Sequence, residues 1–295
     1  MAVEMINNVH YSTAILLGSI HARENITSDL LCKMIDENLF ENITNFNISF
    51  IVMVNPDGVE LSKNGLKSCP NFERKRLVEI NNYNSDFSMW KANGRGVDLN
   101  NNFDADFKKF INSRSFSPGG FAGEFAESEI ETKAILNYVK SIKPFFTISY
   151  HSKGEEIYYN YFQSDNLLKR DKIIAEKFEK STGYLIKNVE NFSCGGFKDY
   201  CVQTLKIPAL TIEVGSDELS HPIGEEFLEE IYEKHKDIAN DLDFAYNIYT
   251  NYKWRLTNEN GSKFYVLWWK VYEKSTIACK ESLCAWWSSS WCCYC

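Results

Sequence analysis

Short apolar runs of strand length alternate along this chain with longer segments whose apolar residues recur every three to four positions. The runs that we predict as strands are 11–20, 46–54, 145–150, 157–162 and 208–214. The segments that we predict as helices are 26–39, 128–138, 167–180, 197–205 and 227–249. Residues 59–95 are polar, and we predict a long loop region with short helical pieces there. Strands that alternate with helices predict an α/β fold with a mixed, mainly parallel twisted sheet flanked by helices.

The composition changes near residue 250, and we place a domain boundary there. Residues 251–295 hold six of the seven tryptophans and five of the nine cysteines, without a helix or strand period. The spacing of these cysteines matches no zinc pattern. We therefore predict a catalytic domain over residues 1–250 and an atypical Trp/Cys-rich tail of unknown role over residues 251–295.

Charge and the N-terminal composition limit the partners. The net charge is −8 and the pI about 5.3, which argues against a broad nucleic-acid surface. The first residues contain no basic segment followed by a long apolar run, so we expect no signal peptide, no transmembrane helix and no membrane partner. Few, scattered cysteines before residue 250 fit a reducing compartment. The expected location is cytoplasmic or unknown.

Histidine and glutamate side chains lie at the ends of three of the predicted strands. His21 and Glu24 come after the first strand, His151 after the third, and Glu213 lies in the last. Sites in open α/β sheets form beyond the carboxyl ends of the strands, so these side chains are expected at one edge. A histidine and a glutamate three residues apart can hold two corners of a tetrahedral zinc site. Taken alone, His21 and Glu24 could equally be a surface histidine and a solvated carboxylate; the ordered partners favour a metal site.

Five short motifs occur in a fixed order between residues 13 and 250. They are H-x-x-E at 21–24, N-P-D-G at 55–58, R-G-V-D-L-N at 95–100, H-S at 151–152 and I-E at 212–213. This ordered set resembles the zinc carboxypeptidase family, the carboxypeptidase A-like metallopeptidases. The segments W-K-A-N at 90–93, N-N-N-F at 100–103 and G-G-F-K-D-Y at 195–200 look most like the bacterial branch that cleaves γ-D-glutamyl-diamino acid bonds in cell-wall peptides. The resemblance implies a carboxypeptidase-like fold.

The resemblance also implies the roles of the site residues. His21, Glu24 and His151 match the zinc ligands, with one Zn²⁺ per chain, and Glu213 matches the general base. A cation is needed to stabilise the oxyanion, and Lys91 and Arg95 are both candidates. Lys91 stands where the family has an arginine, and the sequence does not decide between the two.

Four further residues are predicted to bind substrate: Asn100, Asn101, Ser152 and Lys198. Asn100 could instead be a turn residue, and Lys198 could lie on a solvated helix face. Asp98 either orients a zinc-binding histidine or caps a turn. Asn101 stands where digestive carboxypeptidases have an arginine that binds the substrate's C-terminal carboxylate, so digestive specificity is disfavoured.

These observations predict a zinc metallopeptidase that hydrolyses γ-D-glutamyl-diamino acid bonds in peptides derived from peptidoglycan. The alternatives are a metallocarboxypeptidase that acts on ordinary peptides and a catalytically inactive relative that binds peptides or cell wall. Only 20 residues precede His21, which leaves open that the sheet lacks N-terminal edge strands. An uncovered sheet edge would favour association with other chains.

Overall fold

The computed structural model describes residues 3–8, 11–109, 113–188, 194–251, 255–257 and 263–265. The chain divides into two units, residues 1–252 and residues 253–295. In the second unit, β8 (Arg255–Thr257) pairs antiparallel with β9 (Lys263–Tyr265). The tryptophans and cysteines on which the predicted tail rests lie outside the described residues, so the role of that segment stays a prediction.

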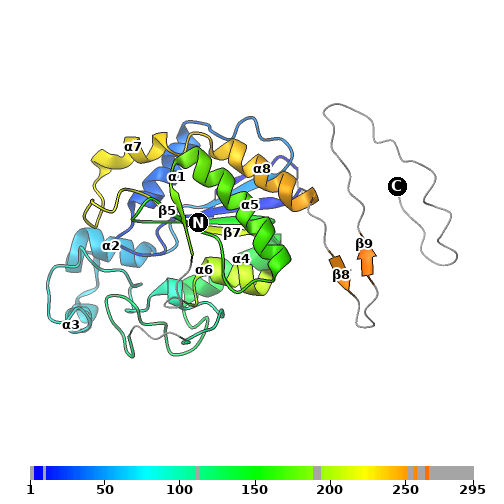
Figure 1. The fold of residues 1–295 in the computed structure, drawn as a ribbon. Coiled ribbons are helices and arrows are strands. Elements are labelled where there is room, and N and C mark those ends of the chain that lie inside the picture. Colours follow the sequence, from blue (N-terminus) through cyan, green and yellow to red (C-terminus); the bar gives the residue numbers. More distant parts are fainter. Residues whose placement is uncertain are drawn as a thin grey trace, which may run out of the picture. The chain divides into compact units, whose positions relative to one another are not determined.

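A seven-stranded mixed sheet forms the centre of the first unit (Figure 1). Its strands are β1 (Val3–Met5), β2 (Thr13–Leu17), β3 (Asn47–Ile51), β4 (Phe146–His151), β5 (Glu156–Tyr158), β6 (Leu185–Lys187) and β7 (Ala209–Glu213). They are arranged in the order β1-β3-β2-β4-β7-β5-β6. The four inner strands β3, β2, β4 and β7 run parallel, while β1 pairs antiparallel with β3 and β5 pairs antiparallel with β7. The predicted mixed, mainly parallel sheet is confirmed.

Helices cover both faces of this sheet. They are α1 (Ile26–Asp36), α2 (Pro56–Asn64), α3 (Asn71–Ile80), α4 (Ile130–Ile142), α5 (Asp165–Thr182), α6 (Phe197–Tyr200), α7 (Leu228–Glu233) and α8 (Ile238–Asn251). Alternate residues of β2 enter different cores, as the period of a strand requires. Ala14 and Leu16 pack with apolar residues of α1, α5, α7 and α8, whereas Ile15 and Leu17 pack with those of α4 and α6.

Two local predictions need correction. The region 59–95 contains the predicted short helical pieces, but the end of α2 and the whole of α3 leave a shorter loop than we predicted. Asn55 caps α2, and Pro56 suits its first turn. The predicted helix 227–249 is two helices, α7 and α8, separated at residues 234–237 where His235 turns into the core. In α4, Glu129 occupies the cap position and Ser128 donates a hydrogen bond to its carboxylate.

The outer side of β3 is not a bare edge. β1 pairs with it through Val3, Glu4 and Met5, and Tyr138 on α4 donates a hydrogen bond to the Glu4 carboxylate. The edge strand in the described structure is therefore the three-residue β1 itself, and such short strands offer little surface for association. None of the helices in the described part of the chain is long and apolar enough to cross a membrane.

Candidate metal centre

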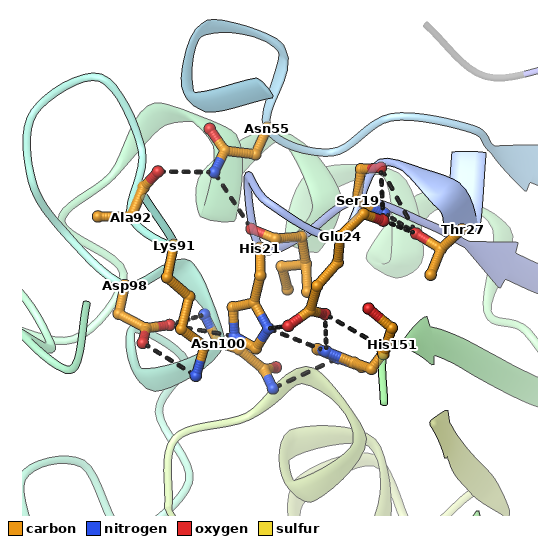
Figure 2. Close-up of polar contacts among 12 residues, drawn as sticks. Ser19, His21, Glu24, Thr27, Asn55, Lys91, Ala92, Asp98, Asn100 and His151 are labelled. Carbon is orange, nitrogen blue, oxygen red and sulfur yellow. Dashed lines mark hydrogen bonds and ion pairs between the residues drawn. The ribbon is translucent and has the colours of Figure 1, made fainter. Parts of the chain in front are cut away.

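The turn between β2 and α1 places His21 and Glu24 on one side. Thr27 Oγ1 accepts a hydrogen bond from Ser19 N (2.8 Å) and donates one to Glu24 O (2.8 Å; Figure 2). Ser28 Oγ donates to Val52 O (2.6 Å). These two hydroxyls therefore fold the turn. The helix that follows, α1, begins at Ile26, after Asn25.

Three side chains with metal-ligating atoms converge beyond the ends of β2 and β4. His21 Nδ1 lies 2.9 Å from Glu24 Oε1, and His151 Nδ1 lies 3.0 Å from both His21 Nδ1 and Glu24 Oε2 (Figure 2). His21, Glu24 and His151 are 5%, 2% and 1% exposed, and their ligand atoms all lie within 4.8 Å of one another. Among the described residues this is the group that could hold a metal ion.

The charges of the group suit a cation with two nitrogen ligands and one oxygen ligand. Burial alone would raise the pKa of Glu24, but His21 and His151 hold that pKa well below its usual range. Burial would lower the pKa of His21, yet Glu24 and Asp98 raise it above its ordinary value. The cluster thus concentrates negative charge around two imidazoles, and its donor set fits a zinc ion with an open fourth position.

Asp98 contacts the groups that both of its open roles require, the ring of His21 and the backbone of the following turn. Its Oδ1 lies 3.3 Å from His21 Nε2 and accepts a hydrogen bond from Asn100 N (3.2 Å), while its Oδ2 accepts from Gly120 N (2.9 Å). Burial would raise the pKa of Asp98, but Lys91 and His21 keep it well below its usual range. A carboxylate on the outer nitrogen of a metal-binding histidine fixes the ring and its tautomer.

The parallel pairing of β4 with β7 brings Glu213 beside His151, with which it is in register. Glu213 is half-buried at the end of β7. Burial raises the pKa of Glu213 to about 7, against the opposing effect of His151. A carboxyl group with a pKa in this range can both accept and release a proton near neutral pH.

The two candidate cations lie in different places. Lys91 Nζ is 3.5 Å from Asp98 Oδ2 (Figure 2), and the carboxylates Asp98, Glu24 and Glu213 raise its pKa against the effect of burial, so it stays charged. Arg95 is exposed and its Nη1 lies 3.5 Å from Glu129 Oε1. Arg95 lines a separate cavity of about 490 Å³ together with Glu129 and Glu131. The structure thus groups Lys91, and not Arg95, with the metal-binding side chains.

The four predicted substrate-binding residues have different surroundings. Asn100 lies beside the metal cluster: its Nδ2 is 3.5 Å from His151 Nε2, and its Oδ1 accepts from Phe197 N (3.0 Å). Ser152 donates its backbone N–H to Glu24 Oε2 (3.3 Å), and its hydroxyl is buried without a partner among the described residues. Asn101 is half-buried beside Asn100.

Lys198 does not lie on a solvated face, as the alternative held. It is buried, pairs with Asp199 Oδ1 (2.7 Å) and donates to Asn160 O (2.8 Å). A buried charge is costly unless it is paired, and Asp199 supplies the partner of Lys198. The substrate-binding roles of all four residues stay predictions.

Two residues of the surroundings were not singled out from the sequence. Asn55 donates from Nδ2 to Ile20 O (3.2 Å) and Ala92 O (3.1 Å), so it joins the loop of His21 to the loop of Lys91 (Figure 2). Arg23 lies between the two predicted ligands of the turn, and it contributes, after burial, to lowering the pKa of His221 to about 4. Asn55 belongs to the N-P-D-G motif and Arg23 to the H-A-R-E segment. Neither pattern shows whether the residue has a structural or a functional role.

Comparisons with known proteins agree with this geometry. The model of the zinc carboxypeptidase family matches residues 7–238. Over 235 residues the chain is 30% identical to gamma-D-glutamyl-L-diamino acid endopeptidase 1 of Lysinibacillus sphaericus, covering 74% of this chain and 57% of the relative. The chain thus spans a little over half the length of the curated relatives it matches.

Solved structures share the fold. The crystal structure of thrombin-activatable fibrinolysis inhibitor superimposes with a TM-score of 0.68 at 17% identity, over 85% of this chain and 65% of that one. The murein-tripeptide amidase of Escherichia coli O157 gives a TM-score of 0.51 at 20% identity, over 81% and 84% of the two chains. The predicted carboxypeptidase-like fold is confirmed by these neighbours.

Proposed function

Since the chain belongs to the zinc carboxypeptidase family, we propose that it is a zinc metallopeptidase that hydrolyses γ-D-glutamyl-diamino acid bonds in peptides derived from peptidoglycan. The convergence of His21, Glu24 and His151 beside Glu213 supports the activity. The name of the Lysinibacillus sphaericus relative supports the substrate class. Residues 1–250 are the catalytic domain in this proposal, and the cellular compartment stays a prediction.

His21, Glu24 and His151 would hold the ion. Bound zinc would polarise the scissile carbonyl group and lower the pKa of its water ligand toward ~7. Glu213 takes the proton of the attacking water and gives it to the leaving amine. The pKa of Glu213, raised by burial, lies where both transfers are accessible. Lys91, which is paired with Asp98, would stabilise negative charge on the carbonyl oxygen in this proposal.

The substrate side of the proposal rests on Asn101 and Lys198. An amide at position 101 cannot bind a C-terminal carboxylate as a guanidinium does. Lys198 is a buried cation on the helix that packs against the Asn100 loop. It is suited to a carboxylate of the diamino acid, which extends beyond the scissile bond.

Incubation of the zinc-loaded chain with a γ-D-glutamyl-diaminopimelate peptide and with a peptide that has an ordinary C-terminal amino acid tests the function. We expect hydrolysis of the first peptide. Cleavage of the second alone would identify a carboxypeptidase. Cleavage of neither, with less than one tightly bound zinc per chain, would identify a binding protein.

Glu213→Gln tests the mechanism. The variant should retain zinc, because Glu213 is not a ligand, and should lose about 10²- to 10⁴-fold in kcat, the usual contribution of a general base. Glu156→Gln is a matched control, since Glu156 is the register partner of Glu213 on β5 and pairs with Lys187. A Glu213→Gln variant with full activity would refute the role of this residue.

A further inference from the structure

The cavity of about 490 Å³ beside Arg95 has an apolar wall. Residues of α2, of α3 and of the first turn of α4 line it, and none of them belongs to the predicted metal centre. Leu61 and Leu77 line it with buried side chains. Ile130, the first residue of α4, also lines it and is 77% exposed, so this side chain packs little against the core. The cavity therefore offers apolar surface to a ligand.

Carboxylates outnumber cations around this cavity, which five acidic side chains and two arginines line. Both arginines are already bound. Arg76 donates from Nε to Glu73 Oε2 (2.6 Å) and from its two terminal nitrogens to backbone carbonyl oxygens. Arg95 Nη1 lies 3.5 Å from Glu129 Oε1. The three remaining carboxylates have no cationic partner among the described residues: Asp57, Glu60 and Glu131. A cationic ligand would offset this excess of negative charge.

Glu131 is the half-buried member of these three carboxylates. It accepts a hydrogen bond from Asn93 Nδ2 (3.2 Å), and a carboxylate has room for further donors. Burial raises the pKa of Glu131, and the charges of Glu129 and Asp57 add to the increase. A cation beside Glu131 would relieve this repulsion, so Glu131 is the best-placed group for binding one.

The spacing of the carboxylates suits an organic cation better than a metal ion. In the part of the chain that the structure describes, the group whose ligand atoms lie close enough to hold a metal is that of His21, Glu24 and His151, and the carboxylates of the cavity form no such group. A primary ammonium group donates three hydrogen bonds from a flexible chain. The methylene groups of a lysine side chain can lie along apolar surface while the ammonium group contacts a carboxylate.

We propose that this cavity binds the side chain of a lysine in a peptide, with the ammonium group at Glu131 and the methylene groups on Leu77 and Ile130. The chain then has a second binding site for peptides, which does not depend on the proposed function. The acidic lining also makes the site selective. A side chain that ends in both an ammonium group and a carboxylate, as in diaminopimelate, binds less well, because its carboxylate meets like charges.

Methyl NMR titration of the full chain tests the proposal with three probes: Nα-acetyl-lysine amide, Nα-acetyl-norleucine amide, which lacks the ammonium group, and meso-diaminopimelate. We expect the lysine probe to shift the methyl signals of Leu61, Leu77 and Ile130 in a saturable way. It should bind about 10- to 100-fold more tightly than the norleucine probe, the range of one charged hydrogen bond. The measurement needs no turnover, so its result is separate from that of the proposed function.

Glu131→Gln should remove most of the preference for the lysine probe and leave binding of the norleucine probe unchanged. Glu179→Gln is the matched control, because Glu179 is a half-buried glutamate outside the cavity whose Oε1 accepts from Ile186 N (3.0 Å). It should behave as the wild-type chain does. Ile130→Ser should weaken both probes several-fold. Since Ile130 is largely exposed, this variant keeps the proposal testable if Glu131→Gln does not fold.

Equal affinity for the lysine and norleucine probes would overturn the proposal. Tighter binding of diaminopimelate than of the lysine probe would also overturn it, as would an unchanged preference in Glu131→Gln. Shifts confined to methyl groups near His21 and His151 would place the probe at the metal centre and would count against a second site.

Discussion

A single carboxylate, that of Asp98, contacts both a predicted zinc ligand and the predicted oxyanion cation. We expect Asp98→Asn to weaken zinc binding about 10- to 100-fold, the usual effect of losing a carboxylate on the outer nitrogen of a metal-binding histidine. The amide is uncharged and cannot stabilise Lys91 in the same way. Competition with a chromogenic chelator measures the affinity.

Asp57→Asn is the control for this prediction, because Asp57 is exposed and lines the cavity of Arg95. Its zinc affinity should equal that of the wild-type chain. Unchanged affinity in Asp98→Asn would mean that the contact with His21 only fills space.

The convergence of His21, Glu24 and His151 could be predicted from the sequence, because these residues follow apolar strands and parallel strands bring their ends to one edge. Which of the two candidate cations lies beside them could not be predicted. Lys91 and Arg95 are four residues apart, but Asn93 Oδ1 accepts from Arg95 N (3.0 Å) and Val97 N (3.0 Å) and turns the chain between them. The turn sends Arg95 toward Glu129, and nothing in the local pattern of residues indicates that direction.

At the level of elements, α6 is docked on the Asn101 loop through a glycine. Gly195 has φ +74°, and a Cβ there would lie 2.5 Å from Asn101 O. Gly183 has almost the same φ, +76°, but a Cβ there would meet nothing within 4 Å. Gly195→Ala should therefore destabilise the fold by about 2 kcal/mol more than Gly183→Ala, because overpacking adds to the left-handed strain that both variants share.

Urea unfolding of the two glycine variants measures the difference. Gly195→Ala should also raise KM, since Phe197 N, two residues further along the chain, donates to the Asn100 side chain (3.0 Å). Equal urea midpoints for the two variants would contradict the prediction, because they would show that the Asn101 loop moves aside without loss of stability.

The inner strands of the sheet could be predicted from the sequence. The inner strands are buried on both faces, so they appear as apolar runs bounded by polar turns. Helices were harder. The apolar period continues from α7 into α8, and the break depends on the tertiary burial of His235. α2 begins at an Asn-Pro pair that is equally typical of a turn, and the structure identifies Asn55 as a helix cap because its Oδ1 accepts from Gly58 N (3.1 Å).

At the scale of the whole molecule, the free energy of unfolding should depend on pH through His235, which lies between α7 and α8. His235 Nδ1 lies 2.8 Å from Ile231 O, its Nε2 has no hydrogen-bond partner in the described part of the chain, and Tyr150 and Tyr184 pack on its ring. Burial, with a contribution from the charge of Lys234, lowers the pKa of His235 to about 4. The folded state therefore keeps this ring neutral where the unfolded chain binds a proton.

The direction of the pH dependence follows from the difference in proton binding between the folded and the unfolded state. Above the unfolded pKa of about 6.5 neither state is protonated, and the full stability is present. As the pH falls toward 4, the unfolded chain gains a proton first, so unfolding becomes easier by about 2 kcal/mol between pH 7 and 5. His221, whose pKa is also lowered to about 4, adds to the slope. Thermal unfolding across this range measures it.

His235→Asn isolates the contribution. Asparagine can still donate to the Ile231 carbonyl but does not titrate, so the variant should be less stable at pH 7 and lose less stability on acidification than the wild-type chain. Parallel curves of unfolding free energy against pH would contradict the prediction.

The contacts of Asn55 bear on how relatives of this chain are classified. Its amide fastens two loops to each other and caps a helix, and none of these bonds depends on a reaction. A descendant that had lost its general base would still need Asn55 in order to fold. The N-P-D-G motif therefore indicates a shared fold. A survey that used this motif to count active enzymes would also count catalytically inactive relatives. Position 213 is the one to inspect for that purpose.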